Sequence, residues 1–180
     1  PGQGMVLDPE SHICFYEGAH SRMSGVGHVL VGSRKGMIDP GELAAVIRAN
    51  RDSARLRLLC LENTHNRSGG RVVPIDLHAK LCEVAHENGM AVHVDGARIF
   101  NAAVASGVPA SEYARHADSV MFCLSKSLSC PLGSVLCGGA EFMKKARQAC
   151  RRLGGGMRQA GIIAAAGIVA LERMVDRLAE

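Results

Sequence analysis

The sequence has no tryptophan, and aromatic residues make up only 3% of it, so few side chains are available for stacking on nucleotide bases. Its formal net charge of +4 is also too small to indicate a nucleic-acid partner. Basic residues do gather between Lys144 and Arg158, but a solvated helix face or an anion contact explains them more simply. We therefore expect no binding to nucleic acid.

Long apolar runs and paired cysteine motifs are missing as well. The longest apolar run, from Ile162 to Leu171, is much shorter than the roughly 18 residues of a membrane span, so we expect no membrane insertion. The seven cysteines form no C-x-x-C pair, and most lie in apolar segments. They are expected to be reduced core residues, which predicts a cytoplasmic location and leaves the mitochondrial matrix open.

The two ends of the chain indicate a fragment. The sequence begins with Pro1, and its last helical pattern runs into Glu180 without a stop signal. We expect residues 1–180 to be part of one domain of a longer protein.

From Asp39 onward, segments with helical and strand-like patterns alternate. Helices are predicted over residues 40–49, 75–87, 99–105, 110–115, 141–152 and 159–178, and strands over residues 56–61, 90–94, 119–124 and 133–137. This alternation predicts an α/β fold with a mostly parallel sheet and helices on both faces. In such sheets, ligands bind beyond the carboxyl ends of the strands.

Polar residues follow three of these strands, and one pair among them is the most informative feature of the chain. Asp95 ends one strand, and Lys126 follows the next. A partly desolvated lysine amine can attack a carbonyl, and an acid can keep a pyridine nitrogen protonated. Together they are the two groups that a pyridoxal 5′-phosphate site requires, although Asp95 taken alone could simply cap the following helix.

Other polar residues at the same edge are further candidates. Arg98 can donate to an oxygen of a cofactor or substrate, and His65 can accept a proton near neutral pH. His93 shares a strand face with Asp95 and could support it. A metal site made of His12, His65, His93 and Asp95 is disfavoured, because no two of these four residues have the i, i+4 spacing of helical ligands.

As a set, these motifs resemble the threonine aldolase family, within the beta-eliminating lyase group of pyridoxal-phosphate enzymes. The resemblance spans nearly the whole chain and rests on six segments: Glu10–Ile13, Glu62–Asn66, His93–Ala102, Ala117–Val120, Leu124–Leu128 and Gly154–Gly161. It implies an aspartate aminotransferase-like fold, of which residues 1–180 would form part of the large, cofactor-binding domain. A preceding phosphate-loop segment and a following small C-terminal domain would be absent.

The resemblance also implies a role for each candidate. Lys126 would bind the aldehyde of the cofactor, Asp95 would pair with its pyridine nitrogen, and His12 would stack on its ring. Arg98 would contact the phenolic oxygen, and His65 would lie near the side-chain hydroxyl of the substrate.

The resemblance further implies a homotetramer with active sites between subunits. Arg158 would then approach a cofactor phosphate across a subunit boundary. The chain departs from the family near Lys126, since Ser127 and Ser129 replace glycines and Cys130 replaces a smaller alanine. These larger side chains could crowd the cofactor.

The activity that the resemblance implies is cleavage of L-threonine or L-allo-threonine to glycine and acetaldehyde, as in threonine catabolism and glycine synthesis. His65 is the first candidate for the base, with solvent or the cofactor phosphate as alternatives. Because a fold does not select its reaction, another pyridoxal-phosphate lyase or a transaminase remains an alternative. A non-catalytic remnant of the same fold is the third.

Overall fold

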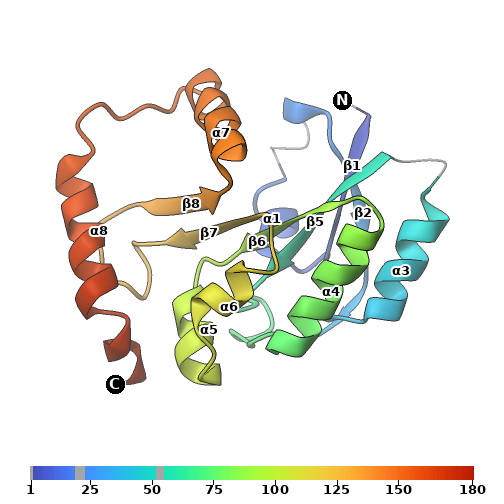
Figure 1. Ribbon diagram of the computed structural model, residues 1–180, viewed down its shortest axis with the longest axis horizontal. Coiled ribbons are helices and arrows are strands. Elements are labelled where there is room, and N and C mark those ends of the chain that lie inside the picture. Colours follow the sequence, from blue (N-terminus) through green and yellow to red (C-terminus); the bar gives the residue numbers. More distant parts are fainter. Residues whose placement is uncertain (1, 19–22, 52–54) are drawn as a thin grey trace.

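The computed structural model describes residues 2–18, 23–51 and 55–180. Its centre is a six-stranded sheet in the order β2-β1-β5-β6-β7-β8 (Figure 1). Neighbouring strands are parallel except for β7 and β8. The mostly parallel α/β fold predicted from the sequence is therefore confirmed. The strands are β1 (Gln3–Leu7), β2 (Gly27–Leu30), β5 (Arg55–Glu62), β6 (Ala91–Asp95), β7 (Ser119–Cys123) and β8 (Ser134–Gly138).

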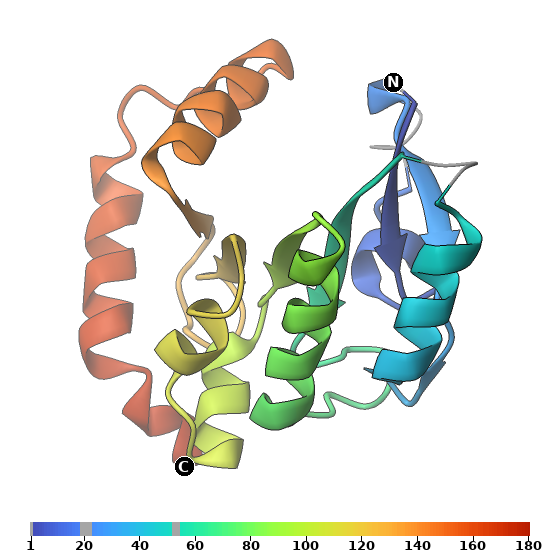
Figure 2. The same ribbon diagram turned by 45° about the vertical axis from the view of Figure 1, so that its right-hand side comes forward.

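Helices cover the two faces of this sheet unevenly. Four lie along one face, where they pack on buried strand residues such as Leu59, Val92 and Val94 (Figure 2). These four are α3 (Pro40–Ala49), α4 (Ile75–Glu87), α5 (Ile99–Ser106) and α6 (Ala110–Ala114). The short helix α1 (His12–Phe15) packs on the other face, against Met5, Leu7 and Cys60.

Local chemistry explains where the clearest helix begins. Oδ1 of Asp39 accepts a hydrogen bond from the backbone N–H of Glu42 at 3.0 Å, and Pro40 takes the first position of α3. The helices predicted over residues 40–49 and 75–87 have the same bounds in the structure.

The region before Asp39 contains elements that the sequence pattern did not predict. Besides β1, β2 and α1, it holds a small antiparallel hairpin made of β3 (Ser33–Arg34) and β4 (Met37–Ile38). Its two turn residues, Lys35 and Gly36, have φ values of 56° and 80°. Two consecutive positive φ values are typical of the tight turns that join paired strands.

Two further helices follow β8 at the edge of the sheet, α7 (Ala140–Arg152) and α8 (Gly161–Arg173) (Figure 1). The helix predicted over 159–178 is shorter, because a 3-10 turn, η1 (Asp176–Ala179), replaces its last part. Cys137 in β8 and Cys150 in α7 are exposed, so the prediction of core cysteines is wrong for these two. No helix within the described residues is long and apolar enough to cross a membrane.

The loop after β7 is anchored on both sides of Lys126. The side chains of Leu124 and Leu128 are 5% and 3% exposed and pack with Ala170 of α8. Lys126 itself is exposed, and its backbone carbonyl accepts a hydrogen bond from the N–H of Ser129 at 3.0 Å. Buried leucines thus fix the loop while the lysine stays accessible.

Ser129 adopts a backbone conformation that suits glycine better. Its φ is 61°, in the left-handed region, where a Cβ atom crowds the following carbonyl. Ser127, the serine that directly follows Lys126 in this loop, does not have a positive φ.

We expect Ser129→Gly to raise the free energy of unfolding of the full-length protein by up to about 1 kcal/mol, because it relieves this crowding. Ser127→Gly is the matched control and should lower that free energy slightly, because glycine gains more freedom in the unfolded chain. Urea unfolding measures both changes. Equal changes in the two variants would contradict the assignment of strain to Ser129.

Candidate active site

The carboxyl ends of three neighbouring parallel strands bring the candidate residues to one edge. In the sheet register, Glu62 of β5 lies opposite Asp95 of β6, and Asp95 lies opposite Met121 of β7. The loop that holds Lys126 leaves β7 just beyond this row. The strand that ends at Asp95 and the strand that precedes Lys126 are therefore neighbours in the sheet, as the sequence predicted.

Asp95 is a buried carboxylate, with 6% of the residue exposed. Its Oδ1 accepts a hydrogen bond from the N–H of Ala97 at 3.1 Å, and its backbone carbonyl accepts one from Asn63. Within the described residues, Oδ2 accepts no hydrogen bond. Oδ2 of this largely buried carboxylate is therefore suited to accept a hydrogen bond from a ligand N–H.

His93 lies on the same strand face as Asp95, two residues earlier. Its Nδ1 is 2.9 Å from Oγ of Ser119 on β7. Burial lowers the pKa of His93, against an opposing contribution from the negative charge of Asp95. A neutral imidazole here supports the strand pair beneath Asp95.

Glu62 ties two of the predicted motifs to the end of β5. Its Oε2 accepts a hydrogen bond from the N–H of His12 at 2.7 Å, and its Oε1 accepts one from the N–H of Asn66 at 2.9 Å. The side chain of Asn66 in turn accepts a hydrogen bond from Arg98 at 3.1 Å. Sequence reasoning gave Glu62 no role, although it begins one of the motifs. The structure shows that it positions His12, Asn66 and, through Asn66, Arg98.

His12 begins α1 at this edge and is half-buried. Its Nε2 lies 3.3 Å from Oε1 of Glu17, and its ring centroid is 5.0 Å from that of Tyr16. The imidazole is therefore held by the two exposed residues that follow its helix, Tyr16 and Glu17, while its backbone is fixed by Glu62.

His65 is much more enclosed than the sequence suggested, with only 2% of the residue exposed. Its Nε2 lies 3.1 Å from Oδ2 of Asp8, within ion-pair distance but off the direction of a regular hydrogen bond. Burial opposes a charged imidazole, but the interaction with Asp8 and the charges of Glu62 and Glu10 outweigh it and raise the pKa of His65.

Asp8 is the second residue of this buried pair, and sequence reasoning did not identify it. Burial favours its neutral form, but the interaction with His65 and hydrogen bonds from Ser33 and the N–H of Glu10 prevail and lower the pKa of Asp8. The pair therefore favours a negative Asp8 beside a positive His65.

Arg158 is not brought to this edge by contacts within the chain. It is exposed in the segment 153–160 between α7 and α8, and it forms no hydrogen bond or ion pair with any described residue. Its predicted role across a subunit boundary stays a prediction.

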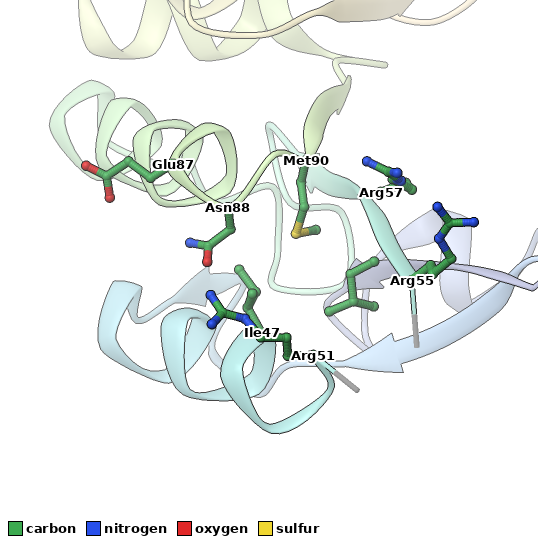
Figure 3. A pocket seen from close by; sticks show the side chains of 8 residues that line it. Ile47, Arg51, Arg55, Arg57, Glu87, Asn88 and Met90 are labelled. Carbon is green, nitrogen blue, oxygen red and sulfur yellow. The ribbon is translucent and has the colours of Figure 1, made fainter. Parts of the chain in front are cut away.

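A separate cavity of about 300 Å³ lies at the opposite end of the strands, where β5 begins (Figure 3). Arg51, Arg55 and Arg57 surround an apolar floor that includes Ile47 and Met90. None of the predicted site residues lines it. The edge that holds Asp95 and Lys126 is therefore the better candidate for chemistry.

Comparisons with known proteins show the family and the fold. The family model of the beta-eliminating lyases matches residues 1–180. A probable low-specificity L-threonine aldolase 2 of Arabidopsis thaliana is 42% identical over 182 residues, which cover 98% of this chain and 51% of that protein. A low specificity L-threonine aldolase of Escherichia coli K12 is 50% identical over 127 residues, covering 71% of this chain and 37% of the relative.

Solved structures share the fold at lower identity. A putative L-allo-threonine aldolase from Listeria monocytogenes has a TM-score of 0.84 at 22% identity and covers 98% of this chain and 48% of its own. The Leishmania major threonine aldolase has a TM-score of 0.85 at 16% identity, covering 99% and 54%. This chain spans about half the length of the first curated relatives it matches. Its match to the family model over residues 1–180 shows that it belongs to the beta-eliminating lyase family.

Proposed function

We propose that the full-length protein is a pyridoxal-phosphate-dependent lyase that cleaves L-threonine or L-allo-threonine to glycine and acetaldehyde. The observation that supports this most directly is the pairing of β6 and β7, which places Asp95 and the loop of Lys126 at one edge of the sheet. The relatives named as low-specificity L-threonine aldolases support the choice of substrate.

The residues at this edge fit the cofactor. Oδ2 of Asp95 is available to accept the pyridine N–H, and Nζ of Lys126 forms no ion pair within the described residues, so it is available for the aldehyde. Arg98 would donate to the phenolic oxygen, and His12 would lie against the ring. When bound, the cofactor supplies a site that accepts the electron pair released from a bond at Cα.

The chain's own residues would hold and orient the reacting groups. The carboxylate of Asp95 would keep a proton on the pyridine nitrogen of the cofactor, which would favour the uptake of electrons by the ring. Lys126 would hold the aldehyde carbon of the cofactor covalently when no substrate is bound. His65 would lie near the side-chain hydroxyl, as the family resemblance implies.

Assembly and location are also part of the proposal. We propose a homotetramer in which Arg158 of one copy reaches the cofactor phosphate of another. Exposed apolar side chains in this segment and at the start of α8 support an interface there, since Leu153, Met157 and Ile162 are 70%, 62% and 86% exposed. The buried, unpaired cysteines such as Cys60 support a reducing compartment, and we propose the cytoplasm.

Acetaldehyde release from L-threonine tests the activity. We expect the full-length protein loaded with pyridoxal phosphate to form acetaldehyde, measured by coupled reduction with alcohol dehydrogenase and NADH. Asp95→Asn should lower kcat on the order of 10²-fold or more, because it removes the charge that stabilises the electron-rich state. Asp76→Asn, the same change at an exposed position of α4, is the control and should leave kcat unchanged.

Other products would contradict the proposal. Ammonia or a keto acid without acetaldehyde would assign the protein to another lyase or a transaminase. No product at all from a cofactor-loaded protein would favour the non-catalytic remnant.

A further inference from the structure

Three segments that are distant in sequence enclose the ring of His65. The segment after β1 contributes Asp8, the β3–β4 hairpin contributes Gly36, and His65 itself follows β5. A Cβ atom on Gly36 would overlap the imidazole ring, so the hairpin turn packs directly on His65 at a point where only glycine fits.

A hydrogen-bond network connects this hairpin to Asp8. The hydroxyl of Ser33 donates to Oδ2 of Asp8 at 2.5 Å and accepts a hydrogen bond from the N–H of Gly36 at 3.1 Å. The N–H of Glu10 donates to Oδ1 of Asp8 at 3.0 Å. Together with the ion pair to His65, these contacts engage both oxygens of a carboxylate that is 3% exposed. The hydrogen bonds from Ser33 and Glu10 thus hold the Asp8 carboxylate in place beside His65.

Three negatively charged side chains act on His65. Asp8 and Glu10 lie in the segment that follows β1, and Glu62 is the last residue of β5. His78 of α4 lines the same small cavity, but burial lowers its pKa to about 4, so it adds no positive charge near neutral pH. The three carboxylates therefore all favour a positively charged imidazole at His65.

Neither ring nitrogen of His65 forms a regular hydrogen bond within the described residues, and only Nε2 has an ion-pair partner there. Nδ1 is buried and forms no hydrogen bond with the described residues. Buried polar atoms almost always have a partner, so an atom without one indicates a place for a ligand or a bound water.

We propose that Asp8 is a positioning residue for His65, and that it holds the imidazole by an ion pair through Nε2 under the β3–β4 hairpin. His65 then takes part in the reaction as a positive group with Nδ1–H as its remaining donor, and not as the base that removes the hydroxyl proton. This inference rests on the proposed function for its chemical consequence, but the ion pair itself is measurable without the cofactor.

The titration of His65 tests the ion pair. The full-length protein without pyridoxal phosphate is labelled with [13Cε1]histidine, and the His65 signal is assigned with His65→Gln. We expect its midpoint in the wild type to lie above 6.5, the ordinary value. Asp8→Asn should move the midpoint to lower pH, because it removes the nearest negative charge while keeping the shape of the side chain.

Glu10→Gln is the matched control, because it removes a neighbouring charge without removing a group that contacts the ring. Its effect on the midpoint should be smaller than that of Asp8→Asn. Equal effects, or no change in Asp8→Asn, would overturn the proposal. If Asp8→Asn does not fold, the titration of His65 in the wild type tests the proposal by itself. A midpoint below 6.5 would overturn the proposal, and a midpoint above 6.5 would support it.

Activity separates the inference from the proposed function. In a wild type that releases acetaldehyde, Asp8→Asn should lower kcat/KM on the order of 10²-fold, and Asp8→Glu should restore part of the loss and of the midpoint. A wild type without acetaldehyde release, in which Asp8→Asn still lowers the midpoint, would refute the proposed function and support the ion pair. An active wild type with an unchanged midpoint in Asp8→Asn would refute the inference alone.

Discussion

The parallel pairing of β5, β6 and β7 is the constraint on which the site depends. Because these strands run in the same direction and in a fixed register, Glu62, Asp95 and Met121 end in one row. The polar loop that follows each strand therefore begins at the same edge of the sheet. A slip of one residue between β6 and β7 would turn Asp95 away from this face, so the buried apolar pattern of the strands also fixes the geometry of the site.

Three buried acids stabilise this edge in different ways. Asp8 is satisfied by a hydroxyl, a backbone N–H and a histidine, whereas Glu62 accepts hydrogen bonds from two backbone N–H groups. Asp95 accepts a hydrogen bond from Ala97 through Oδ1. Buried charges are costly unless they are paired or hydrogen-bonded, so each acid determines the position of the segment that satisfies it. The acids at the edge thereby order α1, the hairpin and the loop after β5.

The sequence predicted the parts of this structure whose signals are local. Asp39 caps α3, and the apolar spacing of α4 gave its bounds, because a cap and a helical period need only nearby residues. The alternation of helices and strands then predicted that Asp95 and Lys126 would follow neighbouring strands. The family resemblance added roles for the individual residues, which the fold accommodates but does not test.

The parts that were missed depend on contacts between distant segments. The ion pair of Asp8 and His65 forms only because β1 inserts beside β5, and no pattern in either segment indicates this pairing. The hairpin was missed because its strands have two residues each, too few for a visible alternation. Cys137 was expected in the core from its apolar neighbours, but it lies on an edge strand and is exposed.

The central claim is that Lys126 and Asp95 act on one cofactor, and covalent trapping at Lys126 tests it most directly. The full-length protein is loaded with pyridoxal phosphate, reduced with borohydride, digested and analysed by mass spectrometry. The account predicts a phosphopyridoxyl group on Lys126, no trapped cofactor in Lys126→Ala, and normal trapping in Lys145→Ala, which changes an exposed lysine of α7. Equal trapping in the wild type and in Lys126→Ala, or a label on another lysine, would contradict it.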